Sequence, residues 1–317
     1  QNWKPRSRAG SKAQDTTPTV WTQGAHFAAA KKVCLSLHAG IANPPEHTEG
    51  SRWSPIEPRV EWADRIEKLH RHFVSSTVEK VVMARAVSTT LPMSKASVTF
   101  ALASLLHAKS DDIIFAFSRE GSVFLGCTPE TLADLENGRV VTHALAGTQA
   151  MNQSDTDFIN NEKIQREHRA VVNDVCEKLK TMSQDVIVEP PRLRYAKAVV
   201  HLETKISARI GDTHLLDVVG QLHPTPALGG SPTEKALAWL RSYETLDRGW
   251  YGGPVGWFSA QGQGRCAVAI RSALLTQQRA YAFAGAGIVD GSDPATEWQE
   301  TSDKLGSVLS ALNGRIQ

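Results

Sequence analysis

Two carboxylates and an amine are spaced to share one face of a helix near the C-terminus. Glu297, Glu300 and Lys304 stand at i, i+3 and i+7 in a segment that begins at Asp293-Pro294, and residues at this spacing are neighbours on an α-helix. Aspartate at an N-cap followed by proline in the first turn is a typical helix start. The sequence therefore predicts a helix that presents two carboxylates in one direction.

A pair of glycines precedes this helix. Gly285 and Gly287 leave their backbone N–H groups open to a carboxylate or a phosphate, which predicts an anion-binding loop. Such a loop beside two carboxylates fits a divalent cation, because the cation can bridge protein carboxylates to a carboxylate of the ligand. The alternative is a glycine-rich strand end that leads into an ordinary solvated helix.

Two side chains elsewhere in the chain could act with this segment. Glu167 falls on the apolar stripe of a predicted helix, where a carboxylate is costly to bury without a partner. With Glu297 and Glu300 it would bring the number of oxygen ligands to two or three, which suits Mg²⁺. Lys80 lies within an apolar strand, where a desolvated amine can act as a base. A glutamate that reaches water and a solvent-facing strand lysine are the structural alternatives.

Three further residues could take part in acid–base chemistry or in anion binding. Glu130 follows a proline at a corner between two predicted strands, and it could be a general acid or a plain turn residue. His201, on a long predicted strand, is typical of a hydrogen-bonded structural histidine. Arg271 lies in an apolar strand, where its guanidinium needs an anionic partner such as a ligand carboxylate.

The composition excludes several classes of protein. Of the 317 residues, 41% are hydrophobic and 21% are charged, which is enough for a substantial core. The net charge of +2, without runs of Lys and Arg among aromatics, argues against a nucleic-acid surface. No apolar run is long enough to span a bilayer. The four cysteines lack metal-binding spacing, so we expect free thiols.

The N-terminal region differs from the rest of the chain. Residues 1–55 have little periodicity and are punctuated by Pro and Gly, so we predict an arm, or the remnant of a longer N-terminal region, before a domain that covers residues 56–317. The first residues show no hydrophobic segment of a secretory signal. The expected compartment is the cytoplasm, and an organelle transit peptide is the alternative for this basic start.

Hydrophobic periodicity predicts the elements that must position these side chains. Helices are expected over residues 58–76, 97–106, 155–182 and 231–243 and after residue 293, the fourth opened by a capping box at Ser231. Strands are expected over residues 80–87, 113–118, 122–126, 132–135, 139–145, 197–210, 255–259, 267–275 and 281–289. Short turns such as Asn137-Gly138 separate many of them. The pattern predicts an α+β fold with largely antiparallel sheets and flanking helices.

Nine short segments, in this order, carry a resemblance to a known family. They are KVVMAR (80–85), GCTPE (126–130), LAGT (145–148), EH (167–168), VVHLETKISARI (199–210), HPTPALGG (223–230), WYGGPVGW (250–257), AIRSA (269–273) and GAGIVDGSDPATEWQET (285–301). Together they resemble the chorismate-utilising enzymes, and most closely the isochorismate synthases. The resemblance extends from about residue 58 to the C-terminus.

This resemblance implies a fold and a reaction. The fold has two large, mostly antiparallel β-sheets with flanking helices, as in component I of anthranilate synthase, with the active site between the sheets. The reaction is the Mg²⁺-dependent isomerisation of chorismate to isochorismate, by attack of water at C2 with loss of the C4 hydroxyl. Lys80 matches the base that activates the water, and Glu130 matches the acid that protonates the departing hydroxyl. Glu167 and Glu300 match the metal ligands, with Glu297 close by.

The resemblance also implies a substrate-binding set and a subclass. The residues that match positions around the substrate are Ala146, Gly147, Thr148, His201, Thr225, Tyr251, Arg271, Gly285, Gly287 and Lys304. Relatives that aminate at C4 generally carry lysine in place of Ala146, which disfavours aminodeoxychorismate synthase. Some relatives carry an acidic residue in place of Ile164, so one outer metal contact is missing from this chain.

Three functional readings follow from the resemblance. HPTPALGG (223–230) favours isochorismate synthase, with salicylate synthase, in which pyruvate elimination follows, as the second reading. A truncated chorismate-binding homologue without turnover is the non-enzymatic alternative. The expected partner is a small molecule, without nucleic acid, membrane or glutamine amidotransferase subunit, and the chain is expected to act as a monomer. The product would enter menaquinone, catecholate siderophore or salicylate biosynthesis.

Overall fold

The structure is a computed structural model that describes residues 51–90, 95–107, 112–150, 154–195 and 199–316. The first fifty residues of the predicted arm lie outside the described residues. Its last five residues form β1 (Ser51–Pro55), which pairs with β2 (Lys80–Thr89) and with the C-terminal β15 (Gly314–Ile316). The segment next to the predicted domain boundary is therefore part of the first sheet.

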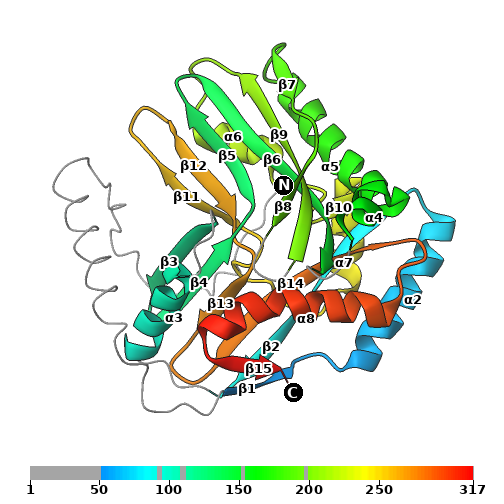
Figure 1. Ribbon diagram of the computed structural model, residues 1–317, viewed down its shortest axis with the longest axis vertical. Helices are drawn as coiled ribbons and strands as arrows, with labels where there is room; N and C mark the ends of the chain where they lie inside the picture. The colour runs from blue at the N-terminus through cyan, green and yellow to red at the C-terminus, as the bar shows by residue number, and fades with distance from the viewer. Residues whose placement is uncertain (1–50, 91–94, 108–111, 151–153, 196–198, 317) are drawn as a thin grey trace, which may run out of the picture.

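Two sheets form the framework of the fold, as Figure 1 shows. The eight-stranded sheet has the order β15-β1-β2-β14-β13-β4-β3, with β10 also paired to β2. Its other strands are β3 (Ile113–Arg119), β4 (Ser122–Thr128), β10 (Gly230–Ser231), β13 (Ser272–Leu275) and β14 (Ala280–Val289). The β1–β15 pair is parallel, and all the other strand pairs of this sheet are antiparallel.

The seven-stranded sheet is antiparallel and has the order β11-β12-β5-β6-β9-β7, with β8 also paired to β9. Its strands are β5 (Thr131–Glu136), β6 (Arg139–Ala150), β7 (Val186–Val188), β8 (Arg192–Tyr195), β9 (Val199–Arg209), β11 (Pro254–Phe258) and β12 (Gly264–Val268). The predicted α+β class with two mostly antiparallel sheets is confirmed.

Helices pack on each sheet (Figure 1). The apolar stripe of α2 (Arg59–Ser75) buries Trp62, Ile66 and Leu69 against β2 and β14, together with α7 (Thr233–Tyr243). The core beside β13 and β14 is covered by α3 (Lys95–His107) and α8 (Pro294–Ala311). Two further helices, α5 (Glu162–Lys180) and α6 (Leu215–Leu222), cover the seven-stranded sheet. Helix α8 starts as predicted, because the Asp293 side chain accepts from Thr296 N.

Three predicted elements are wrong in detail. The predicted helix over residues 155–182 is two helices, α4 (Asp155–Asn160) and α5. The break is at Asn161, whose side chain accepts from Ile164 N at 3.1 Å in the first turn of α5. The predicted strand over residues 267–275 is two strands in different sheets. Ser231 does not cap α7, because it belongs to β10 and pairs with Lys80.

Two short connections carry the chain directly from one sheet to the other. The first joins β4 to β5 through Pro129 and Glu130, and the second joins β12 to β13 through residues 269–271. We call these the two crossings. At the second crossing Arg271 has a φ of 50°, a left-handed conformation that is uncommon for a residue with a side chain. Within the described residues no helix is long and apolar enough to cross a membrane.

Candidate active site

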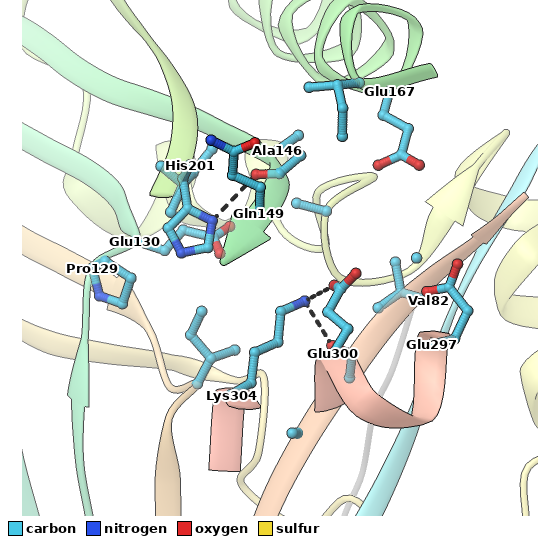
Figure 2. A pocket seen from close by; sticks show the side chains of 18 of the residues that line it. Val82, Pro129, Glu130, Ala146, Gln149, Glu167, His201, Glu297, Glu300 and Lys304 are labelled. Carbon is cyan, nitrogen blue, oxygen red and sulfur yellow. Dashed lines mark hydrogen bonds and ion pairs between the residues drawn. The ribbon is translucent and has the colours of Figure 1, made fainter. Parts of the chain in front are cut away.

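A cavity of about 590 Å³ has walls from both sheets. β2, β14 and α8 contribute from the eight-stranded sheet, and β6, β9 and α5 contribute from the seven-stranded sheet. Figure 2 shows the cavity from close by. Thirteen of the predicted site residues line it: Lys80, Glu130, Ala146, Gly147, Glu167, His201, Tyr251, Arg271, Gly285, Gly287, Glu297, Glu300 and Lys304.

The other two predicted substrate contacts are Thr225 and Thr148. Thr225 is buried outside the lining of the cavity, and its backbone carbonyl accepts from Leu228 N and Gly229 N. It therefore shapes the turn that brings Leu228 to the cavity. Thr148 pairs with His201 between β6 and β9, and its side chain lies outside the described residues.

Glu130 is a buried carboxyl group at the first crossing. The side chain points into the cavity, while its backbone carbonyl accepts from Val268 N at 2.9 Å and its N–H donates to Thr128 Oγ1. Burial raises the pKa of Glu130 to about 7, against the opposing effect of the Lys304 and Lys80 cations. A carboxyl group with this pKa can hold a proton near neutral pH, as a general acid must.

Lys80 is the first residue of β2, and it is only 6% exposed. Its side chain runs over Gly287 of β14, where a Cβ would lie 2.4 Å from Lys80 Cε. Its Nζ lies 3.8 Å from Glu167 Oε2 on α5. A side chain at position 287 would therefore have to displace the end of the Lys80 side chain from this place.

The second charged pair of the cavity is on α8. Lys304 Nζ donates to Glu300 Oε1 at 2.5 Å and to the carbonyl of Gly285 at 3.0 Å (Figure 2). The expected loop conformation is wrong, because Gly285 and Gly287 lie within β14, opposite Ala84 and Val82 of β2, as the strand alternative predicted. Binding of an anion at these glycines stays a prediction. The glycines form a flat strand wall of the cavity, and a Cβ at Gly285 would lie 3.0 Å from Tyr251 Oη.

His201 and Arg271 meet at the wall built from β9 and the second crossing. Arg271 Nη2 lies 3.1 Å from His201 Nε2, and His201 Nδ1 lies 3.3 Å from the Gly147 carbonyl. Because a guanidinium only donates, Nε2 must accept and Nδ1 must carry the hydrogen. Burial and the Arg271 charge hold the pKa of His201 well below its usual range, so the ring is neutral.

A backbone irregularity aims the Gly147 carbonyl at this ring. The register between β6 and β9 shifts between Ala146 and Thr148, and Gly147 has a φ of 76°. A Cβ at Gly147 would lie 2.7 Å from Ile164 Cγ2 of α5. Glycine is therefore required by both the left-handed backbone and the close approach of Ile164.

Sequence comparisons show the family to which the chain belongs. The sequence model of the chorismate binding enzyme family matches residues 13–313. The chain belongs to this family. It is 36% identical over 263 residues to isochorismate synthase MenF of Bacillus subtilis, and 37% identical over 266 residues to the salicylate biosynthesis isochorismate synthase of Pseudomonas aeruginosa. These alignments cover 80% and 81% of this chain but only 56% of each relative.

Solved structures of the family have the same fold. The menaquinone-specific isochorismate synthase MenF of Escherichia coli superposes with a TM-score of 0.78 at 29% identity, over 90% of this chain and 69% of that chain. The putative 2,3-dihydroxybenzoate-specific isochorismate synthase DhbC of Bacillus anthracis superposes with a TM-score of 0.77 at 25% identity, over 83% of this chain and 74% of that chain.

The carboxylates that the sequence predicts as metal ligands line one cavity in this family member. Glu167 comes from α5, and Glu297 and Glu300 come from α8 (Figure 2). Within the described residues no three acidic, histidine or cysteine side chains are gathered closely enough to hold a metal by themselves. An all-carboxylate donor set suits Mg²⁺, which keeps waters and takes ligand oxygens as well. The donor atoms are thus of the kind that Mg²⁺ takes, and its remaining ligands would have to come from water or a bound molecule.

Arg248 is a lining residue that the sequence analysis missed. It follows α7 and lines the cavity beside Val82 and Leu228. Its side chain pairs with Glu244 at 2.5 Å. The spacing of glutamate and arginine four residues apart was the available signal, but it lies outside the segments that carried the resemblance.

Proposed function

We propose that this chain is an isochorismate synthase, an isomerase that converts chorismate to isochorismate. The observation that carries the proposal is a carboxyl group with a pKa of about 7, Glu130, in the same buried cavity as the amine of Lys80. The family membership and the names of the relatives point to chorismate as the substrate. The chain spans 56% of the length of those two relatives. That this part is active by itself is therefore included in the proposal.

In this proposal two side chains move the protons. Lys80 takes a proton from a water that attacks C2 of the ring, and Glu130 gives a proton to the C4 hydroxyl, which leaves as water. One water is added and one is lost, so the overall reaction is an isomerisation. Glu130 ends ionised and Lys80 ends protonated, and exchange with solvent resets both.

The charges of the cavity suit a dianionic substrate. Arg271 and Lys304 are the cations available to the carboxylates of chorismate, and neutral His201 stands between Arg271 and Gly147. Gly287 leaves room for the Lys80 side chain to lie along the strand wall, and Gly285 leaves room for Tyr251. When bound, Mg²⁺ would screen the substrate carboxylate from the protein carboxylates. Glu167, Glu297 and Glu300 are the residues that would hold it.

The proposal extends to the assembly, the compartment and the pathway of the protein. The chain is proposed to act as a monomer in the cytoplasm, without a glutamine amidotransferase subunit. Three biosynthetic destinations are considered for the product: menaquinone, catecholate siderophores and salicylate. The relatives have names that refer to salicylate biosynthesis and to menaquinone, and these names alone do not select among the destinations for this chain.

Product analysis tests the proposal. The protein is incubated with chorismate and Mg²⁺, and the products are separated by chromatography against a reaction with chelator in place of Mg²⁺. Isochorismate without pyruvate is the expected result. Salicylate with pyruvate would make the chain a salicylate synthase, and anthranilate formed with ammonia would contradict both activities. Chorismate binding without any product would support the non-catalytic homologue.

A further inference from the structure

The edge of β2 that faces away from β14 has a gap between two partner strands. β10 pairs with Lys80 and Val81 at one end, and β1 pairs with Val87 and Ser88 at the other. Between them no strand of the described residues pairs with the backbone of Val82 and Ala84 on this side, although both residues are buried. Buried backbone groups need hydrogen-bond partners, so something else must complete this edge.

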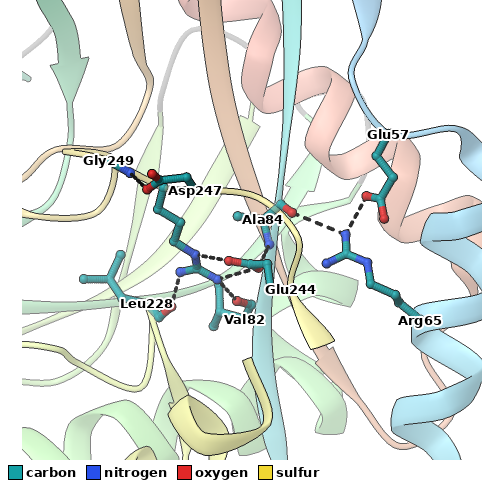
Figure 3. A network of polar contacts seen from close by, with 9 residues as sticks. Glu57, Arg65, Val82, Ala84, Leu228, Glu244, Asp247 and Gly249 are labelled. Carbon is teal, nitrogen blue, oxygen red and sulfur yellow. Dashed lines mark hydrogen bonds and ion pairs between the residues drawn. The ribbon is translucent and has the colours of Figure 1, made fainter. Parts of the chain in front are cut away.

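Side chains supply those partners, as Figure 3 shows. Arg248 Nη2 donates to the Val82 carbonyl at 2.6 Å, and Ala84 N donates to Glu244 Oε2 at 2.9 Å. The two side chains also bond to each other twice, through Nε to Oε1 and Nη2 to Oε2. The pair thus offers one donor to the Val82 carbonyl and one acceptor to the Ala84 N–H, in place of the missing neighbour.

Arg248 also contacts the segment of residues 228–229 and lines the cavity. Arg248 Nη1 donates to the Leu228 carbonyl at 3.2 Å, and Val82 N donates to the Gly229 carbonyl at 3.1 Å. Arg248, Val82 and Leu228 line the cavity. The guanidinium therefore joins β2 to the 228–229 segment at the wall of the cavity, where most of its donors are already used.

The position of β2 matters because Lys80 lies at its start. The lysine stem passes over Gly287 so closely that a Cβ there would be 2.4 Å from Cε. A small displacement of β2 would move Nζ relative to anything bound in the cavity. Misplacement of a reacting group by about 1 Å can lower a rate about 100-fold.

We propose that Glu244 and Arg248 are positioning residues, which take the place of a neighbouring strand on β2 and thereby hold Lys80 in its catalytic position over Gly287. The role of Lys80 as base rests on the proposed function, whereas the effect of the pair on the β2 backbone does not. Separate measurements therefore test the two parts.

Hydrogen exchange at the Ala84 amide tests the effect on the backbone. Glu244→Leu removes the acceptor and Glu244→Gln keeps an amide oxygen in its place. We expect faster exchange at Ala84 in Glu244→Leu and in Arg248→Met, and near wild-type exchange in Glu244→Gln. Unchanged exchange in Glu244→Leu and Arg248→Met would overturn the proposal, whether or not the protein turns over chorismate.

Kinetics test the effect on Lys80. In Arg248→Met we expect kcat to fall roughly 10- to 100-fold with KM within about threefold of wild type, because geometry rather than binding is lost. In Arg248→Lys, which keeps one donor, we expect an intermediate loss. A rise in KM with unchanged kcat would overturn the proposal by assigning Arg248 to substrate binding.

A pH profile distinguishes this role from simple destabilisation. The Lys80 and Lys304 cations both lower the pKa of Glu130, so a displaced Lys80 should move the limb of kcat/KM that reports Glu130 to higher pH. The matched control is Lys178→Met, since Lys178 pairs with Asp174 at i,i+4 and donates to the Leu222 and Pro224 carbonyls, outside the cavity lining. An equal loss of kcat in the control, or an unmoved limb in Arg248→Met, would overturn the proposal.

If the wild-type protein forms no isochorismate, the proposed function is wrong. The exchange rate at Ala84 then still tests whether the pair holds the backbone of β2.

Discussion

The cavity combines two kinds of wall, and they differ in how they handle charge. At the two crossings, Glu130 and Arg271 are 6% and 7% exposed, and burial shifts the pKa of each toward the neutral form. On the regular elements, Lys80 faces Glu167 and Lys304 pairs with Glu300, so positive and negative charges are neighbours. In the proposed reaction the buried carboxyl group of the first crossing therefore supplies a proton, whereas Arg271 at the second crossing and the paired side chains of β2, α5 and α8 would bind charged ligands and a cation.

Lys80 is the exception that tests this division, since it lies on a regular strand and is assigned to proton transfer. Its place depends on glycine at position 287 and on the Glu244–Arg248 pair at the edge of β2. The difference shows how a regular strand could hold a base: the neighbouring residues would have to confine the lysine side chain to one conformation. At the first crossing, by contrast, burial is what raises the pKa of the acid Glu130.

The largest effect is expected from removal of the base. Lys80→Ala should lower kcat about 1000-fold or more, within the upper range for general base catalysis, while Mg²⁺-dependent binding of chorismate persists. Steady-state kinetics and calorimetry measure the two quantities, with Lys235→Ala on α7 as a surface control. Retained turnover would remove Lys80 from the role of base.

The second effect concerns the free energy of unfolding, which the buried Glu130 lowers when it is ionised. The pKa of Glu130 is about 7 in the folded protein and ordinarily 4.5, so stability is complete below about pH 4.5 and falls as the pH rises to about 7. Glu130→Gln keeps the site neutral and should raise the free energy of unfolding by roughly 3 kcal/mol at pH 8, with little change at pH 4.

Denaturant unfolding at several pH values measures this gain. The exposed Glu136→Gln is the control, and its stability should follow that of the wild type at each pH. The same Glu130→Gln protein should have lost most of its turnover, since an amide cannot act as the acid. Equal stability of Glu130→Gln and wild type at pH 8 would show that burial does not shift this carboxyl group.

The third effect sharpens the role of the strand wall. Gly287→Ala places a methyl group where the Lys80 stem lies, and we expect kcat to fall roughly 10- to 100-fold as the amine is displaced. Gly306→Ala on α8 is the matched control, because nothing lies within 4 Å of its added Cβ. The control should keep its activity and gain up to about 1 kcal/mol in stability. Similar activities in the two variants would contradict the close approach.

The smallest effect is expected at the second crossing. Arg271→Lys keeps the charge but loses the guanidinium that bonds to His201 Nε2. We expect KM for chorismate to rise roughly tenfold with a smaller change in kcat, in line with the loss of one charge-assisted hydrogen bond. A fall in kcat alone would move Arg271 from substrate binding to the chemical step.

Much of this arrangement could be predicted from the sequence, where local signals sufficed. The cap at Asp293 and the spacing of Glu297, Glu300 and Lys304 predicted α8 and the face that it turns to the cavity. β2 was predicted from its β-branched and apolar residues. These elements depend on residues close in sequence, which is why pattern and structure agree.

The rest depended on contacts between distant segments. β12 and β13 read as one apolar strand because both are largely buried, and only sheet pairing shows that the chain changes sheets at Arg271. Gly285 and Gly287 suggested a loop, but pairing with β2 makes them a strand. The role of Arg248 needed the gap in β2, which no periodicity in the sequence reveals.

The source of the new hydroxyl group tests the central claim most directly. Chorismate and Mg²⁺ are incubated with the protein in water enriched in the heavy oxygen isotope, and the product is examined by mass spectrometry. Water attack assisted by Lys80, with loss of the hydroxyl protonated by Glu130, predicts isochorismate that carries one heavy oxygen atom at C2. Unlabelled isochorismate, or no isochorismate at all, would contradict the account.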